Sequence, residues 1–399
     1  MIVYVAGTFD TKSAELGFIA ERVETAGVAV KTVDLSATGP ASSADVTPQE
    51  IAACHPDGVD AVFTGDRGTA VAGMAEAFKH WTQAHISDIG GMVSAGGSGG
   101  TALVTPALQV LPIGVPKVMV STVASGNVEA YVGPSDIMMM YSVTDVQGLN
   151  AISRKVLGNA AAAIAGMARY GVDESPRPDE KPGLGLTMFG VTTAAVQAVI
   201  NEVSDAYEPF VFHATGVGGR SMEKLADGGF FKAVVDLTTT EVCDMLFGGV
   251  FAASEDRFGA IIRQKLPYVG SVGALDMVNF GAPGTVPERY KGRQFYEHNP
   301  QVTLMRTTPD ENAQMGTWIA KRLNQMDGPV RFLLPEGGVS ALDADGMPFH
   351  DPAALDSLFA AIRETFEESD TRKLITVPHN LNTADFAQAA AHALADVTA

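Results

Sequence analysis

The chain has 399 residues, of which 46% are hydrophobic, and its formal net charge is −19 at pH 7. A chain of this length and apolar content is expected to form about two or three domains with cores of their own. So acidic a protein would repel a phosphate backbone, which excludes nucleic acid as the expected partner. The two cysteines, Cys54 and Cys243, lack the spacing of metal ligands, so we predict neither a disulfide framework nor a structural metal.

The hydropathy pattern and the cysteine content favour a cytoplasmic protein. The first residues, MIVYVAGTFD, show no basic targeting segment, and a strand is predicted almost at once. The longest apolar stretch, residues 157–168, is too short to cross a bilayer and is predicted to be a buried helix. We therefore expect no membrane partner and a location in the reducing cytoplasm.

Strands and helices are predicted to alternate along the first half of the chain. Residues 2–7 (IVYVAG) form a β-rich run, and residues 12–27 carry apolar side chains at helical spacing. Such alternation is typical of a parallel, doubly wound sheet. Further strands are predicted at residues 28–35, 60–65, 89–95 and 116–122, and further helices at residues 67–81 and 101–109.

A polar, proline-rich segment, residues 170–183, interrupts this pattern and is expected to be a linker. The pattern then restarts, so we predict an α/β protein of two Rossmann-like lobes, each a mainly parallel doubly wound sheet, with a ligand cleft between them. The first lobe, residues 1–175, is expected to bind nucleotide or phosphate, and residues 176–399 form the second. Strands of the second lobe are predicted within residues 184–190, 209–216, 232–242, 266–274, 329–335 and 373–377.

The sequence AGGSGGT, residues 95–101, predicts a phosphate-binding loop. Glycines without side chains let amide groups approach an anion, and the N-terminus of the following helix adds partial positive charge. The alternative is a flexible connection, although four glycines in five positions would make it entropically costly. NAD is disfavoured because no acidic residue ends the next strand, and no Walker A motif occurs. The predicted contacts are Gly96, Gly97, Ser98, Gly99, Gly100 and Thr101.

Polar residues also follow the first strand and precede the helix predicted at residues 67–81. In GTFDTK we expect Thr8, Asp10, Thr11 and Lys12 to contact the ligand, Lys12 through a phosphate and Asp10 through a hydroxyl or a metal-bound water. Arg67 could bind a phosphate through hydrogen bonds from its guanidinium group. The alternatives are helix capping by Asp10 or Thr11 and a surface ion pair for Arg67.

The second lobe contains a similar loop, HATGVGGRSM, which predicts contacts with a second ligand. Histidines at strand ends beside carboxylates could perform acid–base chemistry, which makes His213, Glu336 and His379 the candidate catalytic residues. The alternative for each histidine is a hydrogen-bonded structural role. The predicted second-ligand contacts are Thr215, Gly216, Gly218, Gly219 and Arg220.

A series of motifs runs in order along nearly the whole chain. They are GTFDTK, AGGSGGT, MMMYSVTDVQGLN, HATGVGGRSM, DLTTTEV, SVGALDMVNFG, YEHNPQVTLMRTT and PEGGVSALDADGMPFHDP. Together they resemble the ATP-binding inhibitory domain of the tomato mosaic virus resistance protein and its bacterial and fungal relatives. The resemblance implies two Rossmann-like subdomains, ATP binding and a homodimer. The plant protein continues into a barrel-type domain that we do not expect here, so its antiviral activity is not expected to transfer.

Three functions follow as hypotheses. The first is an ATP-binding protein in which AGGSGGT and GTFDTK hold the triphosphate with magnesium, suited to phosphoryl or nucleotidyl transfer on a small molecule. The second is a nucleotide-independent lyase, isomerase or hydrolase that acts on a phosphorylated sugar or hydroxy acid through His213 or His379 with Glu336. The third is a non-catalytic module in which ATP changes a partner surface.

Overall fold

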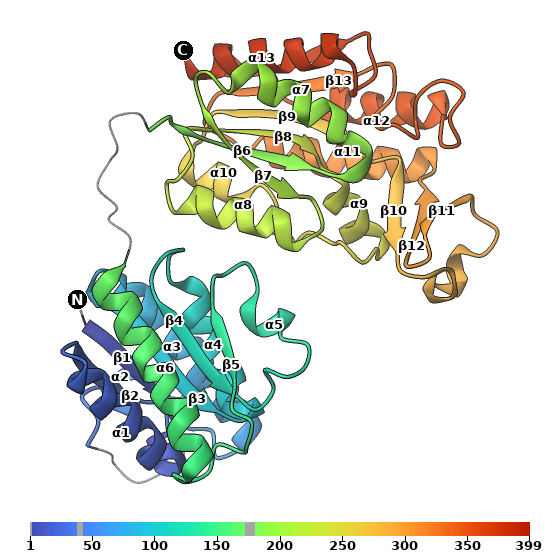
Figure 1. The fold of residues 1–399 in the computed structure, drawn as a ribbon. Helices are drawn as coiled ribbons and strands as arrows, with labels where there is room; N and C mark the ends of the chain where they lie inside the picture. The colour runs from blue at the N-terminus through green and yellow to red at the C-terminus, as the bar shows by residue number, and fades with distance from the viewer. Residues whose placement is uncertain (1, 38–42, 172–179) are drawn as a thin grey trace. The chain divides into compact units, whose positions relative to one another are not determined.

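The computed structural model describes residues 2–37, 43–171 and 180–399. The chain divides into two compact units, Met1–Ser175 and Pro176–Ala399, and each is described here by itself. Both units are built on a parallel sheet with helices on its two faces, so the predicted α/β class is confirmed (Figure 1). Residues 172–179, the centre of the predicted linker, lie outside the described residues.

The first unit contains a five-stranded parallel sheet in the order β2-β1-β3-β4-β5. Because β1 lies between β2 and β3, the chain winds outward in opposite directions from the β1/β3 pair, which is the topological switch point of this sheet. Ligands of open α/β sheets bind outside the carboxyl ends of the strands at such a point. The strands are β1 (Ile2–Gly7), β2 (Ala29–Asp34), β3 (Ile89–Gly96), β4 (Lys117–Ser121) and β5 (Met138–Tyr141).

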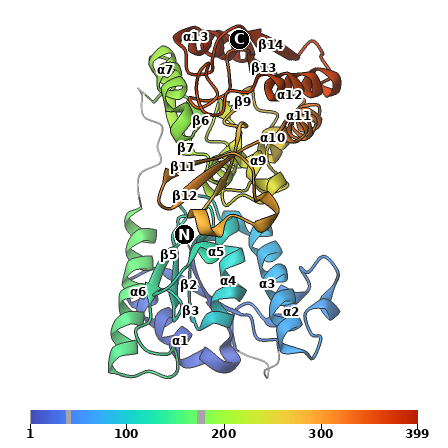
Figure 2. The ribbon, with the colours of Figure 1, turned by 90° about the vertical axis from the view of Figure 1, so that its right-hand side faces the viewer.

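Helices bury both faces of this sheet. Val3 and Val5 of β1 pack toward the α1/α6 face, whereas Tyr4 and Ala6 pack toward the α3/α4 face, as the alternation of side chains along a strand requires. Figure 2 shows α1 and α6 on one side of the strands and α3 and α4 on the other. The helices are α1 (Phe9–Thr25), α2 (Pro48–Ala52), α3 (Arg67–Ala84), α4 (Ser98–Val110), α5 (Glu129–Val132) and α6 (Ala151–Tyr170), with short 3₁₀ helices η1 (Val59–Ala61) and η2 (Ile86–Asp88).

Two features of the first unit differ from the sequence prediction. Residues 60–65 are not a strand: the chain forms η1 there and turns at Gly58 and Gly65, whose φ angles are 86° and 82°. A positive φ favours glycine, and it interrupts the extended backbone that a strand needs. The edge strand β5 was not predicted, because its methionines lack the β-branched side chains that favour strands.

The second unit repeats the topology of the first with one more strand. Its parallel sheet has the order β14-β13-β9-β8-β6-β7, so the first strand again lies between the second and the third. The switch point of this sheet is therefore the β6/β8 pair. The strands are β6 (Gly183–Met188), β7 (Glu208–His213), β8 (Ala233–Thr238), β9 (Tyr268–Gly273), β13 (Val330–Pro335) and β14 (Arg372–Val377).

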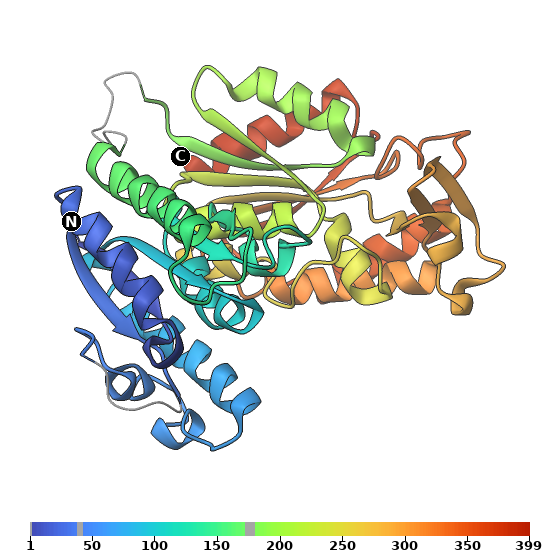
Figure 3. The ribbon, with the colours of Figure 1, turned by 60° about the horizontal axis from the view of Figure 1, so that its bottom comes forward.

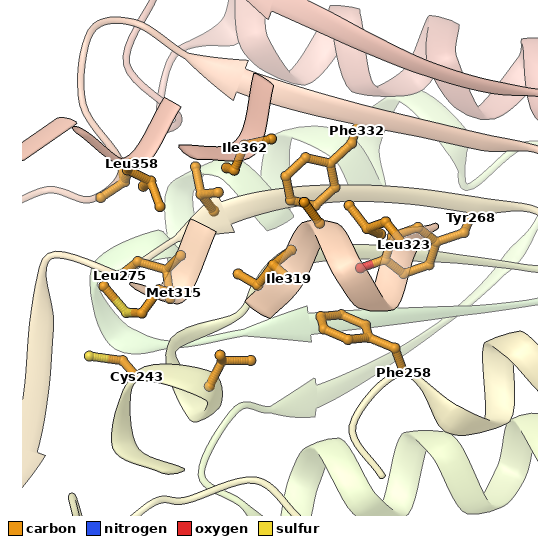
Figure 4. Close-up of a cluster of buried hydrophobic side chains, with 14 of the residues drawn as sticks. Cys243, Phe258, Tyr268, Leu275, Met315, Ile319, Leu323, Phe332, Leu358 and Ile362 are labelled. Carbon is orange, nitrogen blue, oxygen red and sulfur yellow. The ribbon is translucent and has the colours of Figure 1, made fainter. Parts of the chain in front are cut away.

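Helices α7 and α13 cover one face of the second sheet, as Figure 3 shows, and the other helices cover the opposite face. The core of that opposite face is packed around Tyr268, Ile319 and Phe332 (Figure 4). The helices are η3 (Gly190–Thr192), α7 (Thr193–Val203), α8 (Val217–Asp227), α9 (Thr240–Phe247), α10 (Gly259–Gln264), α11 (Pro309–Leu323), α12 (Pro352–Thr365) and α13 (Ala384–Thr398).

Between β9 and β13 the chain forms an additional antiparallel sheet that the sequence did not predict. Its strands β10 (Met277–Phe280), β12 (Val302–Arg306) and β11 (Phe295–Asn299) are hydrogen-bonded in that order. The connection from β10 to β11 passes through η4 (Pro283–Thr285) and η5 (Glu288–Tyr290). These strands are only four or five residues long, so each gives a weak periodic signal.

A buried ion cluster centred on Arg257 joins α8, β8 and α9. The guanidinium group lies 3.0 Å from Glu223, 2.7 Å from Asp236 and 3.2 Å from Glu241, and the Arg257 side chain is 2% exposed. Burial raises the pKa of Glu223 and of Glu241, because desolvation outweighs the attraction of Arg257. A single cation thus holds three carboxylates in the interior of the unit.

We predict that Arg257→Met lowers the free energy of unfolding by about 3–5 kcal/mol, because it leaves buried carboxylates without their cation. Urea denaturation measures this loss. The control is Arg263→Met, which removes the pairs with Asp227 and Asp256 at a side chain that is 48% exposed and should cost about 1 kcal/mol or less. Equal losses in the two variants would contradict a stabilising role for the cluster.

Candidate functional site

A cavity of about 520 Å³ opens at the carboxyl edge of the first sheet, at the β1/β3 switch point. Loops that follow β1, β2, β3 and β5 and the start of α3 contribute its walls. All but one of the residues predicted to bind the cofactor line this cavity. They are Thr8, Asp10, Thr11, Lys12, Arg67, Gly96, Gly97, Ser98, Gly99 and Gly100.

The glycine cluster forms the first turn of α4. Gly97 is the N-cap, and Ser98 and Gly99 are exposed at the cavity wall. A Cβ atom added to Gly99 or Gly100 would meet no atom within 4 Å, so the missing side chains leave open space in front of the backbone. The first amide groups of a helix have no acceptor within the helix, and its dipole places positive charge there. This turn is therefore suited to an anion.

Thr101 is the exception among the predicted contacts, because its side chain is fully buried and does not line the cavity. Its hydroxyl group donates to the carbonyl oxygen of Gly97 at 2.8 Å and lies 2.6 Å from the Ser121 hydroxyl oxygen. These bonds fix the start of α4 against the end of β4. Thr101 therefore positions the glycine turn and is not among the residues that line the cavity.

The GTFDTK loop lines the cavity, and most of its amide groups are already bonded within the protein. The Phe9 amide donates to Asp34 Oδ1 at 3.1 Å, and the Asp10 amide donates to Ser36 Oγ at 3.0 Å. The Lys12 amide donates to the Thr8 carbonyl oxygen at 2.8 Å, and the helix bends at Lys12, where φ is −128° and ψ is 20°. Asp10 and Thr11 do not cap α1 with their side chains, since Thr8 is the N-cap residue.

The charges in the cavity balance. Lys12 and Arg67 are cationic and Asp10 and Asp145 are anionic, and all four residues line the cavity. Aliphatic side chains form a further part of the wall. Sequence reasoning missed the lining residues Asp145, Ser94, Leu35, Ala37, Ala70, Val71, Leu103 and Val104. Asp145 lies in the motif MMMYSVTDVQGLN, which contributed to the family resemblance but to no assignment of chemistry.

The loop that carries Asp145 is held in a strained conformation. Val143 has a φ of 66°, which is unfavourable for a β-branched residue. The loop is anchored on both sides of Asp145: the Ser142 amide donates to the Ser121 carbonyl oxygen at 3.2 Å, and the Gly148 amide donates to the buried Glu15 at 2.5 Å. These bonds direct Asp145 to the cavity.

The glycine loop of the second unit binds a carboxylate of the protein itself. The amides of Gly216 and Gly219 donate to Glu241 Oε1 at 2.6 and 3.0 Å. The Thr215 hydroxyl donates to the His213 carbonyl oxygen at 3.2 Å, and Arg220 Nε donates to the Gly216 carbonyl oxygen at 3.3 Å. Gly218 is required because a Cβ atom would lie 1.8 Å from the His213 carbonyl oxygen. The amides of Gly216 and Gly219, predicted to bind a second ligand, are thus already engaged.

The three candidate catalytic residues are not all brought together. His213 ends β7 at one edge of the sheet, whereas Glu336 follows β13 near the other edge, roughly 20 Å away at the usual strand spacing. His379 is close to Glu336 through a main-chain bond from Gly337 to the His379 carbonyl oxygen. Their side chains face different partners, since Glu336 lies 3.8 Å from Arg363 and His379 lies 3.8 Å from Asp385.

The second switch point is closed by side chains. Asn382, from the loop after β14, accepts a bond from the Ala195 amide in the first turn of α7 at 3.2 Å and donates to the Val191 carbonyl oxygen at 2.9 Å. The hydroxyl oxygens of Thr192 and Thr238 lie 2.8 Å apart across the β6/β8 pair. A side-chain amide therefore occupies the place that a phosphate would take at this helix.

Near the carboxyl edge of the second sheet, α9 carries a buried carboxyl group with an unusual pKa. Burial raises the pKa of Asp244 to about 7, although its oxygens accept bonds from the Phe251 and Asn279 amides, each at 2.8 Å. Burial and the neighbouring Asp343 also raise the pKa of Asp276. Desolvation disfavours a charged carboxylate more than these hydrogen bonds favour it.

We compare the free energy of unfolding of the wild-type protein with that of Asp244→Asn. We predict that the wild-type value minus the variant value falls by about 1.4 kcal/mol for each pH unit between pH of roughly 4 and 7. In this range the folded state holds a proton that the unfolded state has released, so stability from this group is complete at low pH and lost above pH of about 7. Asparagine does not titrate in this range. Its NH2 group faces a backbone N–H donor, so the substitution also lowers the free energy of unfolding by an amount that does not depend on pH. Urea denaturation at several pH values measures the difference; parallel curves would contradict it.

Two α/β units, each built on a parallel sheet, and a glycine-lined cavity at the switch point of the first define a protein of the doubly wound α/β class. The chain belongs to the Uncharacterised protein family (UPF0261). The N-terminal domain of that family matches residues 1–173, and its C-terminal domain matches residues 181–398.

Two relatives show how far the similarity extends. A UPF0261 protein of Rhizobium meliloti is 54% identical over 396 residues, which cover 99% of this chain and 98% of the relative. The ToMV resistance protein Tm-1 of Solanum lycopersicum is 43% identical over an alignment of 410 residues. The alignment covers 97% of this chain and 54% of the relative. The resemblance inferred from the motifs is thereby confirmed. The ATP binding and the homodimer that it implies stay predictions.

Among solved structures, the glycosyltransferase SsfS6 of Streptomyces sp. SF2575, complexed with thymidine diphosphate, is 11% identical with a TM-score of 0.19, covering 68% of this chain and 81% of its own. So low a score carries no argument about this protein.

In the part of the chain that the structure describes, none of the helices has both the length and the apolar surface that crossing a bilayer requires.

Proposed function

We propose that the first unit binds ATP in the cavity at its switch point. The observation that supports this most directly is the open first turn of α4. A Cβ atom added to Gly99 or Gly100 there would meet no neighbouring group within 4 Å. Lys12 and Arg67 line the same cavity and would neutralise phosphate charge. The family resemblance implies ATP as the nucleotide.

The size and the chemistry of the cavity suit a nucleotide better than a bare phosphate. Its volume of about 520 Å³ is within the range of small-ligand sites. The glycine turn and the two cations would take the triphosphate. Leu35, Val71 and Leu103 add aliphatic residues to the lining, against which the flat face of an adenine ring would pack.

The donor set also fits magnesium as a companion of the phosphates. Asp10 and Asp145 offer hard carboxylate oxygens, the ligands that this ion prefers, beside the glycine turn. The described residues contain no group of three or more His, Cys, Asp or Glu side chains placed to hold a metal ion. Magnesium usually binds with nucleotide through one or two carboxylates and the phosphates, so Asp10 and Asp145 would hold it only once nucleotide is present.

The reaction that this site could support is phosphoryl or nucleotidyl transfer. Such transfer depends chiefly on positioning and on electrostatic stabilisation, which the glycine turn, Lys12 and Arg67 would supply. A module that only senses ATP would use the same contacts. The acid–base alternative has weaker support, because His213 lies at the opposite edge of the second sheet from Glu336 and His379 faces Asp385.

We predict that Gly99→Val lowers the affinity for ATP at least about tenfold, because the new side chain fills the space in front of the α4 amides. Lys12→Ala should weaken binding by a similar factor, through the loss of a charge-assisted contact. Isothermal titration calorimetry measures both. The control is Gly17→Val in α1, another helical glycine with nothing within 4 Å, which lies outside the cavity. Unchanged affinity in both site variants would refute this assignment.

We predict that Asp145→Asn strengthens the binding of metal-free ATP severalfold and reduces the enhancement that magnesium provides. The substitution removes a negative charge that repels the phosphates when no cation lies between them. Titrations with magnesium and with a chelator give the two affinities. The exposed Asp57→Asn, outside the cavity, is the control. If Asp145→Asn leaves the magnesium dependence unchanged, Asp145 does not face the bound phosphates.

A further inference from the structure

The additional antiparallel sheet of the second unit carries a second cavity, which is independent of the proposed nucleotide site. Its strands come between β9 and β13 along the chain. The parallel sheet of the unit has its doubly wound order without them. The connection from β10 to β11, residues 281–294, crosses one face of the antiparallel sheet. Together with strands β11 and β12 it lines a cavity of about 310 Å³ that is open to solvent.

Contacts around Tyr290 hold this connection in place. The Tyr290 hydroxyl donates to the Phe247 carbonyl oxygen at 2.5 Å, and its ring lies 5.5 Å from that of Phe280. Arg293 pairs with Glu311 at 2.7 Å. The cavity is therefore a built part of the unit, with walls tied to the body of the protein on both sides.

The cavity has an apolar wall and one buried polar group without a partner. Pro283, Val286, Pro287 and Phe295 provide the apolar surface. Thr303 of β12 lines the same cavity with a residue exposure of 2%, and its hydroxyl oxygen has no hydrogen-bond partner in the structure. Buried hydroxyl groups are nearly always bonded, so the Thr303 hydroxyl group would accept a bond from a molecule in the cavity once its side chain turns toward it.

A carboxylate lies beside this hydroxyl group. Glu297 and Thr303 are directly opposed in the β11/β12 ladder, so their side chains share one face and lie about 5 Å apart at Cβ. Glu288 at the rim is paired with Lys291 at 3.0 Å, whereas Glu297 forms no ion pair within the described ranges. Glu297 thus gives the cavity its uncompensated negative charge.

We propose that this cavity binds a small organic amine in its protonated form. Its ammonium group would donate to the Glu297 carboxylate and to the Thr303 hydroxyl oxygen, and its apolar body would pack against the two prolines and Val286. The ring of Phe295 adds a surface that attracts cations. A neutral or anionic molecule of the same shape would leave Glu297 unpaired or repelled.

Benzylamine, benzyl alcohol and benzoate test this assignment, because they share an aromatic ring and differ in charge. Ligand-observed NMR titrations of the full chain should give a dissociation constant of about 1 mM for benzylamine. The alcohol and the acid should bind about threefold more weakly or worse, since neither pairs with the exposed Glu297 carboxylate. The proposal is overturned if benzyl alcohol and benzoate bind as tightly as benzylamine does. It is also overturned if benzylamine shows no saturable binding.

Variants locate the binding. Glu297→Gln and Thr303→Val should each weaken benzylamine binding about fivefold or more, whereas Thr303→Ser, which keeps the hydroxyl group, should not. Thr303→Val removes a group without a partner, so its thermal midpoint should not fall. The exposed Glu202→Gln on α7, outside the cavity, is the charge-matched control. If Glu297→Gln and Thr303→Val both bind benzylamine as the wild type does, the amine is not bound in this cavity.

Discussion

The constraint on which this protein depends is that a parallel sheet must be covered on both faces. Parallel strands are joined by helical crossovers, and these bury both faces under apolar side chains. Only the strand ends then remain open to a ligand. In the first unit the crossovers leave the β1/β3 pair in opposite directions, so the loops after these strands part and leave a cavity of about 520 Å³. The position of the site thus follows from the winding of the chain.

The two units share this winding but use their switch points differently. In the first unit the glycine turn of α4 faces open space, and its neighbouring loop is fixed through Asp34 and Ser36. In the second unit Asn382 bonds to the first turn of α7, and Glu241 accepts bonds from the amides of the glycine loop. Glu241 is in turn held by Arg257. Glycine-rich loops of similar composition therefore face a cavity in one unit and an internal carboxylate in the other.

The proposed nucleotide site explains how an acidic protein could bind an anion. The net charge of −19 acts over the whole surface and is screened within about 10 Å at ordinary salt. Inside the cavity, Lys12 and Arg67 offset Asp10 and Asp145, and the α4 amides add positive potential without adding formal charge. The cavity of the antiparallel sheet has the opposite character, because Glu297 gives it a negative charge without a partner. The two sites would therefore select ligands of opposite charge.

The sequence by itself determined the α/β class, nearly all the parallel strands, and the cavity lining formed by GTFDTK, Arg67 and the glycine cluster. These features are local, since apolar periodicity and glycine runs are visible within a few residues. Tertiary structure alone decided the rest. It placed Asp145 at the cavity through a strained loop, buried Thr101 against Ser121, and bonded the second glycine loop to Glu241, which lies 22 to 25 residues further along the chain. It also formed the antiparallel sheet from strands too short to be recognised singly. Such contacts depend on which strand ends become neighbours, and no local pattern encodes that.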